Sequence, residues 1–129
     1  MNAPEFLLRD VIEYLHDQAV RAHGGHFGIR DETMIESALA RPRQKWAYGD
    51  PPPDMSALAA AYAFGLGRNH AFVDGNKRTC WAACVLFLKS NGVSIGAPGY
   101  ESVENMVALA EGTLSEDDLA DWLRSRIRS

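Results

Sequence analysis

The 129-residue chain has little of what marks membrane, secreted or nucleic-acid-binding proteins. It contains no stretch long and apolar enough to span a bilayer, so we expect no membrane partner. Its first residues carry no basic head followed by an apolar run, so we expect a cytoplasmic protein without a secretory signal. A basic excess is also absent, because the formal net charge is −4. This argues against duplex binding, and we expect no direct nucleic-acid partner.

Thiol and imidazole groups are too sparse to predict a zinc or redox site. Cys80 and Cys84 are four residues apart, which fits one face of a helix and not a Cys-x-x-Cys motif. We expect both to be small buried hydrophobic side chains, with a regulatory thiol as the alternative. His23 and His26 are two potential metal ligands without a convincing third, so a helix-ending loop is the preferred interpretation.

Apolar residues at helical spacing predict an all-α fold, a single-domain bundle of about six helices covering residues 1–129. We expect helices over residues 4–22, from 31 to about 40, from 54 or 56 to about 69, from 79 to about 90, about 99–111, and 115–127. Asp31, Asp54 or Ser56, and Ser115 are suitable N-caps, and Pro42 is expected to end the second helix. The fourth helix is apolar on every side, which predicts the buried centre of the bundle.

Two further structural predictions concern a loop and a helix face. Residues 41–53 combine prolines, glycine, basic side chains and aromatic rings, which predicts an irregular segment. It is either a surface connection or a flap over a binding groove, because unstructured loops of about 12 residues are often functional. The fifth helix is expected to turn four side chains inward: Val103, Met106, Val107 and Ala110.

The segment His70-Ala-Phe-Val-Asp-Gly-Asn-Lys-Arg78 joins two predicted helices, and its second half opens the fourth helix. A helix N-terminus presents free N–H groups and partial positive charge, so it attracts anions. Gly75 lets the backbone approach a ligand closely. Lys77 and Arg78 add two cations suited to phosphate oxygens.

Two other residues of this segment suit group transfer. Asp74 is a hard oxygen ligand for magnesium bound to phosphates, and His70 can take a proton from a hydroxyl near neutral pH. Taken singly, these residues have ordinary explanations: a capping histidine, an Asp-Gly turn and a solvated cation pair. Together, at the mouth of an apolar helix, they predict transfer from a nucleotide. Phe72 is expected to be a buried anchor for the loop.

This segment resembles the signature loop of the Fic/Doc superfamily. In that loop a His, a Phe, an acidic residue, a small residue, an Asn and an Arg recur in this order. Six positions match: His70, Phe72, Asp74, Asn76, Lys77 and Arg78. Lys77 resembles the Doc branch, because AMP-transferring members usually have Gly there. Further resemblance to Doc proteins lies in His23-Gly24-Gly25, Gly28-Ile29-Arg30-Asp31, Ser37-Ala38-Leu39-Ala40-Arg41 and Leu88-Lys89-Ser90-Asn91-Gly92.

The resemblance implies a role for each matching residue. His70 would be the base toward the target hydroxyl, and Asp74 would hold magnesium. The phosphates of ATP would be bound by Asn76, Lys77 and Arg78, with Gly75 allowing their approach. Arg68 lies where Doc proteins carry another phosphate-facing arginine.

The resemblance also implies an activity. Doc toxins are kinases that phosphorylate a threonine of translation elongation factor Tu and so stop protein synthesis. Their nucleotide is reversed relative to that of the AMP transferases, with its terminal phosphate toward the target. Two alternatives stay open: an AMP transferase of the same fold, and a catalytically silent antitoxin-binding co-repressor. Intact His70 and Asp74 argue against the silent module.

Many Fic proteins inhibit themselves with a Ser/Thr-x-x-x-Glu-Gly/Asn helix whose glutamate blocks the nucleotide. The nearest match here, Val107-Ala108-Leu109-Ala110-Glu111-Gly112, lacks the hydroxyl residue. The resemblance therefore implies a separate antitoxin of the Phd type. Its disordered C-terminal segment would fold into a groove of the toxin on binding.

Overall fold

The computed structural model describes residues 3–96 and 99–128, and within them the chain forms six helices and one pair of very short strands. In order these are α1 (Arg9–His23), α2 (Glu32–Tyr48), α3 (Met55–Arg68), α4 (Asn76–Ser90), β1 (Ser94–Ile95), α5 (Gly99–Glu111), α6 (Glu116–Arg126) and β2 (Ile127–Arg128). The strands pair antiparallel, with Ser94 opposite Arg128. The predicted all-α class is confirmed. The sequence also predicts a short extended connection over residues 93–98, of which residues 97 and 98 lie outside the described residues.

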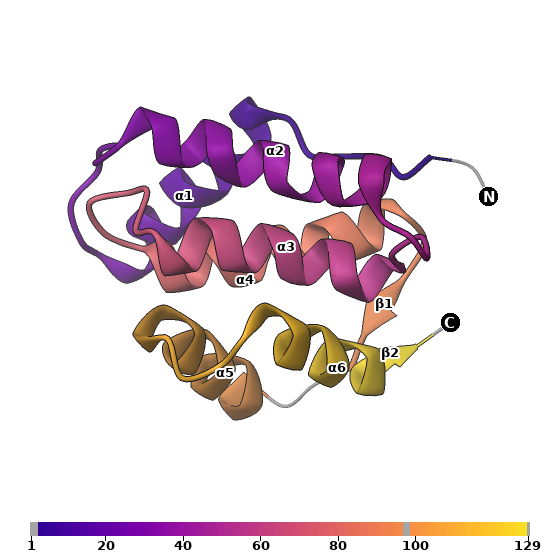
Figure 1. The fold of residues 1–129 in the computed structure, drawn as a ribbon. Helices are drawn as coiled ribbons and strands as arrows, with labels where there is room; N and C mark the ends of the chain where they lie inside the picture. Colours follow the sequence, from indigo (N-terminus) through magenta and orange to yellow (C-terminus); the bar gives the residue numbers. More distant parts are fainter. Residues whose placement is uncertain (1–2, 97–98, 129) are drawn as a thin grey trace.

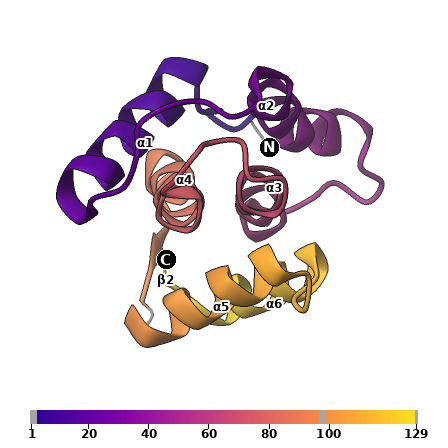
Figure 2. The ribbon, with the colours of Figure 1, turned by 90° about the vertical axis from the view of Figure 1, so that its left-hand side faces the viewer.

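The helices are stacked in three layers, with α3 and α4 in the middle, α1 and α2 on one side and α5 and α6 on the other (Figures 1 and 2). Helix α3 packs against α2, α4, α5 and α6. Its alanines and glycines allow this close approach, since a Cβ at Gly65 would lie 2.9 Å from the Cα of Ala38. Helix α4 lies in the middle layer (Figure 2), which confirms the predicted buried central helix. It shares this position with α3, which is enclosed nearly all round, whereas Trp81 and Leu86 of α4 are only half-buried.

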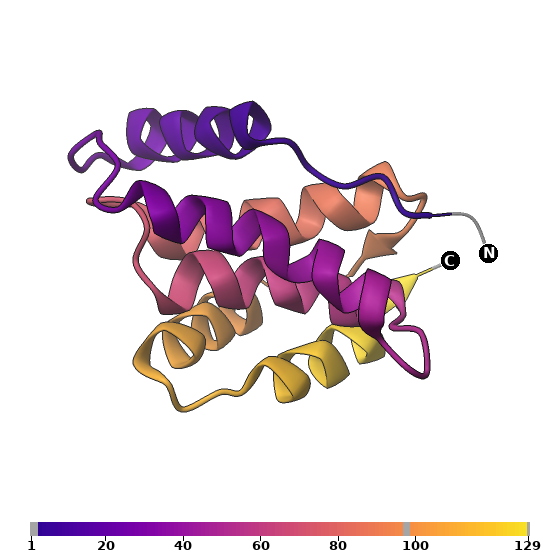
Figure 3. The same ribbon diagram turned by 45° about the horizontal axis from the view of Figure 1, so that its top comes forward.

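Helix α1 begins at Arg9 and not at residue 4 as predicted. The preceding backbone is hydrogen-bonded to other helices instead. The Leu7 N–H donates to the Tyr62 hydroxyl at 2.8 Å, and the Glu5 N–H donates to Asn91 Oδ1 at 2.8 Å. Figure 3 shows this segment running beside the end of α4. Because these long-range bonds use backbone groups of Glu5 and Leu7, the segment stays extended.

The prediction that Pro42 ends the second helix is also wrong, because α2 continues through this proline to Tyr48. An interior proline costs about 3 kcal/mol, so tertiary contacts must stabilise the following turns. Arg41 and Lys45 both bind the Glu116 carboxylate at the start of α6, with Arg41 Nε 2.6 Å from Oε1. Arg43 lies over the Phe6 ring at 4.8 Å.

The longer α2 shortens the predicted irregular segment 41–53 to the residues after Tyr48. Figure 1 shows this connection at the opposite end of α3 from the 70–78 loop. The structure therefore favours a surface connection over a flap. The segment that does lie against the loop is 24–30, through an antiparallel bridge between Ile29 and Phe72.

The core face of α5 is shifted from the predicted one. Its buried residues are Ser102, Met106 and Leu109. Val103, predicted to point inward, is 62% exposed, whereas Val107 and Ala110 are half-buried. Ser102 can be buried because its hydroxyl donates to the Gly99 carbonyl at 2.8 Å, which satisfies its polar group.

Candidate active site

The loop between α3 and α4 has a fixed backbone because it pairs with residues 28–31. The Val73 N–H donates to the Gly28 carbonyl at 3.0 Å, and the Arg30 N–H donates to the Ala71 carbonyl at 2.9 Å. These bonds flank the bridge between Ile29 and Phe72. A segment distant in the sequence thereby holds the loop against the end of the bundle.

His70 is exposed and has a φ of +50°, a left-handed conformation that is uncommon for a residue with a Cβ. The side chain of Arg30 holds it there. Arg30 Nε donates to the His70 carbonyl at 2.6 Å, and Arg30 Nη2 donates to the Asn69 carbonyl at 2.7 Å. The imidazole is left accessible to a protein hydroxyl, as a base toward such a group must be.

Beneath the loop, Phe72 is fully buried, as predicted. Its ring stacks on that of His16, with centroids 3.8 Å apart and an interplanar angle of 9°. His16 Nε2 lies 2.8 Å from the backbone carbonyl oxygen of Asp74. Helix α1 therefore supports the loop both by packing and by a polar contact.

Asp74 is half-buried, and both its backbone and its side chain have partners. Its Oδ2 accepts a hydrogen bond from the His26 N–H at 2.7 Å. A Cβ at Gly25 would lie 3.1 Å from the Asp74 Cβ, so the glycine permits this approach. The carboxylate is thus fixed at the edge of the loop, and its oxygens are of the type that could hold a magnesium ion.

Asn76 closes the loop on itself. The Phe72 N–H donates to Asn76 Oδ1 at 2.9 Å, and Asn76 Nδ2 donates to the Phe72 carbonyl at 2.8 Å. The side chain is buried and engaged with the loop backbone. Any phosphate contact predicted for Asn76 would therefore come from its backbone N–H, at the first residue of α4.

The start of α4 is open to an anion. Helices α2, α3 and α6 are capped by the side chains of Asp31, Asp54 and Ser115, as predicted. The N-cap of α4 is Gly75, with a φ of +77°, which has no side chain to accept the first N–H groups. The next residues include Lys77 and Arg78, so the first turn also carries two cations. This end of α4 therefore combines free N–H groups with positive charge.

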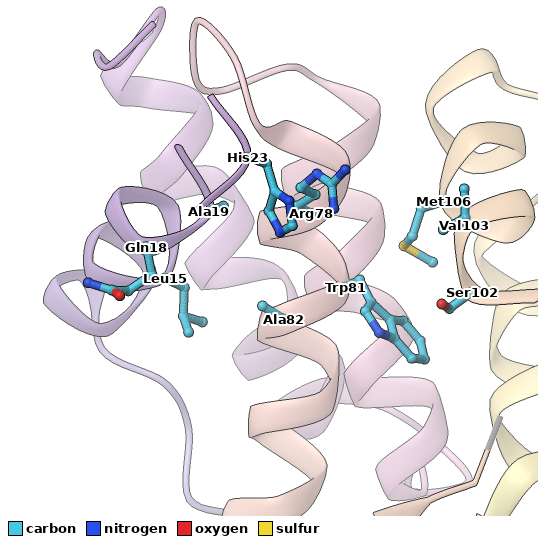
Figure 4. A pocket seen from close by; sticks show the side chains of 10 residues that line it. All are labelled: Leu15, Gln18, Ala19, His23, Arg78, Trp81, Ala82, Ser102, Val103 and Met106. Carbon is cyan, nitrogen blue, oxygen red and sulfur yellow. The ribbon is translucent and has the colours of Figure 1, made fainter. Parts of the chain in front are cut away.

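A pocket of about 370 Å³ lies at this helix start. Its lining residues are Ala19, His23, Gly24, Gly25, Asp74, Gly75, Asn76, Lys77 and Arg78. It adjoins a second, more apolar pocket of about 350 Å³ between α1, α4 and α5. The two share Ala19, His23 and Arg78, and Figure 4 shows the side chains of His23 and Arg78 close together above Trp81. A polar cavity that continues into an apolar one suits the phosphates and the base of a nucleotide.

The predicted site residues do not all line this pocket. Asp74 to Arg78 do, whereas His70 lies in the same loop on the side held by Arg30. Arg68 is exposed, and its guanidinium lies against Gly112, where a Cβ would be 2.9 Å from Nη2. It is therefore directed toward the turn after α5. Its predicted phosphate contact stays a prediction.

Sequence reasoning missed His16, His23 and Arg30 as parts of the site. A signal for His16 was present, because it stands on the buried stripe of α1 between Ile12 and Val20, four residues from each. A histidine on an apolar face has to satisfy its ring nitrogens inside the protein. Arg30 offered no comparable signal, since its partners are backbone carbonyls forty residues away.

Other chemical groups of the chain are less suited to a site. Cys80 and Cys84 are free and buried, as predicted; burial raises the pKa of Cys80 to about 12 and raises that of Cys84 as well. Among the described residues, no three His, Cys, Asp or Glu side chains cluster with metal-binding geometry. A search of the same residues found no helix with the length and apolarity needed to cross a membrane.

The fold and site define a class: an all-α bundle in which α4 starts without a side-chain cap, beside a loop that carries a histidine and a pocket lined by cations. Residues 6–88 match the model of the Fic/DOC family. The chain belongs to this family, which confirms the resemblance drawn from residues 70–78.

Two relatives extend the comparison. The protein kinase doc of Escherichia phage P1 is 34% identical over 111 residues, which cover 85% of this chain and 86% of that protein. The toxin Doc of Mycolicibacterium smegmatis is 49% identical over 77 residues, which cover 59% of this chain and 58% of that protein.

Proposed function

We propose that this chain is the toxin of a toxin–antitoxin pair and a protein kinase that acts in the cytoplasm. It transfers the γ-phosphate of ATP to a threonine of elongation factor Tu and so blocks translation. The observation that carries this proposal is the uncapped start of α4, flanked by Lys77, Arg78 and the Asp74 carboxylate, below the loop that also carries the exposed His70. The names of the two relatives, a toxin and a protein kinase, support it.

In the proposed reaction, the His70 imidazole accepts the proton of the threonine hydroxyl. The hydroxyl oxygen forms a bond to the γ-phosphorus, the bond from that phosphorus to the β,γ-bridging oxygen breaks, and ADP leaves. Lys77, Arg78 and the N–H groups of the first turn of α4 hold the phosphate oxygens. Asp74 would hold magnesium, which neutralises charge on those oxygens when bound.

Lys77 is the residue that favours phosphate transfer over AMP transfer. It stands in the first turn of α4, is exposed and lines the polar pocket. A long cation there occupies space that a glycine would leave open, and it attracts the more highly charged end of the nucleotide. The terminal phosphate is then placed in the polar pocket near the loop of His70, and the base in the apolar pocket.

The apolar pocket also suits the antitoxin. Trp81, Met106 and the largely exposed Val103 line it, and these side chains match the apolar face of a segment that folds on binding. Because His23 and Arg78 line both pockets, a bound segment would reach the nucleotide site. We expect antitoxin and ATP to compete. Trp81 gives a fluorescence signal for either ligand, and a Trp81→Phe variant is the matched control.

The test of the proposed function is to incubate the purified protein with elongation factor Tu and magnesium-ATP and to analyse the target by mass spectrometry. A threonine carrying one phosphate, absent with the His70→Ala variant, is the expected result. An AMP adduct on the target would show that the protein is an AMP transferase and not a kinase. An unmodified target, under conditions where the toxin arrests growth, would contradict the choice of elongation factor Tu.

A further inference from the structure

His16 occupies an unusual position for a histidine. It is 5% exposed, in the middle of the buried stripe of α1, and it is packed flat against Phe72. Its Nε2 lies 2.8 Å from the Asp74 carbonyl oxygen. A carbonyl oxygen can only accept a hydrogen bond, so the proton must be on Nε2. The contact therefore fixes both the tautomer of the ring and the direction of the Asp74 carbonyl.

The direction of that carbonyl determines where the next N–H points. The peptide bond between Asp74 and Gly75 is trans, and in a trans peptide the C=O and the N–H point in opposite directions. Because the Asp74 carbonyl points inward to His16, the Gly75 N–H points outward. Asp74 and Gly75 both line the polar pocket, so this N–H is available to an anion there.

The Asp74–Gly75 peptide can flip unless another residue holds it, because Gly75 is conformationally free. Its φ of +77° is readily exchanged for other values because it has no Cβ. A flip of the Asp74–Gly75 peptide would turn the carbonyl oxygen toward the pocket, where it would repel phosphate. His16 also fills the adjacent space, since a Cβ at Gly75 would lie 3.6 Å from the His16 Cδ2.

We propose that His16 is a positioning residue that keeps the Asp74–Gly75 peptide in the orientation that offers the Gly75 N–H to a phosphate. It acts through the loop and does not touch the nucleotide. This role rests on the proposed function only in that the ligand of the pocket is a nucleotide phosphate. It assigns to α1 a part in phosphate binding, through a bond that spans 58 residues of sequence.

Two variants separate the ring proton from the packing. His16→Phe keeps a flat ring against Phe72 but removes the donor, whereas His16→Gln keeps an N–H at similar reach but removes the ring. Calorimetric titration with magnesium-ATP should show affinity about tenfold weaker for His16→Phe. His16→Gln should stay within about threefold of wild type. Melting curves of both variants report whether the fold itself is altered.

A second measurement needs no variant. The ¹⁵N chemical shifts of the His16 ring in the free wild-type protein should show a proton on Nε2, and the Gly75 amide signal should move when magnesium-ATP is added. A proton on Nδ1 alone, or wild-type affinity in His16→Phe, would overturn the proposal. Equal loss in both variants would assign His16 to packing and overturn it too. Failure of the proposed function can be told apart from failure of the His16 proposal, because it would show as ATP binding without transfer to a protein.

Discussion

Arg30 holds the carbonyl oxygen of His70 at 2.6 Å from its Nε, and this bond fixes the loop residue that we assign as the base. The second arm of the guanidinium holds the preceding carbonyl, that of Asn69, at 2.7 Å. The planar guanidinium holds two consecutive carbonyls in one fixed geometry, which the flexible ammonium of a lysine does not reproduce. The geometry of His70 therefore depends on a residue of the segment before α2.

Arg30→Lys should lower kcat for transfer and leave the KM for ATP nearly unchanged. The expected loss is about ten- to a hundredfold, because a misplaced base costs rate without removing a phosphate contact. Steady-state kinetics at saturating target measure it. A large rise in KM with an unchanged kcat would instead place Arg30 in nucleotide binding.

His70→Ala should abolish toxicity while the fold is retained. The side chain is exposed, so its removal leaves no cavity, and loss of a general base typically costs 10²–10⁴ in rate. Growth after induced expression, with the protein level checked in the same cells, is the measurement. Full growth arrest by a well-expressed variant would remove His70 from the mechanism.

Asp74→Asn should weaken magnesium-dependent ATP binding more than it weakens stability. The amide oxygen can still accept the bond from the His26 N–H, but it lacks the charge that magnesium favours. Calorimetry with and without magnesium, beside a melting curve, tests this. A large fall in melting temperature with unchanged ATP affinity would make Asp74 a structural residue.

Lys77→Gly should reduce phosphate transfer about ten- to a hundredfold, because a charge-assisted contact to phosphate contributes about 1.5–3 kcal/mol. Lys77 is exposed, so the fold should tolerate the change apart from the cost of a glycine in the first turn of α4. Lys77→Ala is the matched control, since it removes the cation without adding backbone freedom. Undiminished transfer in both variants would show that Lys77 does not bind the transferred group.

Glu101 should make the stability depend on acid pH. Hydrogen bonds from Trp122 Nε1 and from Arg126 lower its pKa below the ordinary value of 4.5. A lowered pKa in the folded state gives stability that is present above the unfolded pKa and lost as the pH falls through the folded one. As the pH is lowered from about 5 to about 3, the melting temperature of the wild type should therefore fall further than that of Glu101→Gln. Parallel curves would contradict this role.

The features that sequence predicted well are local ones. The caps Asp31, Asp54 and Ser115 were predictable because a cap acts on residues two or three positions away. The loop 70–78 was predictable because its chemistry lies in nine consecutive residues. Contacts between residues far apart in the sequence were not predictable. No local rule shows that Glu116 supports α2 beyond Pro42, or that His16 and Arg30 hold the loop from beneath.

The part of α3 in the centre of the bundle was missed for a related physical reason. Hydrophobicity predicted α4, whose large side chains include Trp81 and Leu86, as the buried centre. Helix α4 shares that centre with α3, where alanine and glycine let four other helices approach. Small residues are weakly hydrophobic one by one, so their effect on packing is visible only when the neighbours are in place.

The label that ATP leaves on its protein target tests the central claim most directly. Wild-type protein is incubated with elongation factor Tu and with ATP labelled on either the α- or the γ-phosphate, beside the His70→Ala variant. A kinase transfers the γ-label alone, and this is the predicted result. Transfer of the α-label by the wild type would contradict it, and would make the protein an AMP transferase despite Lys77.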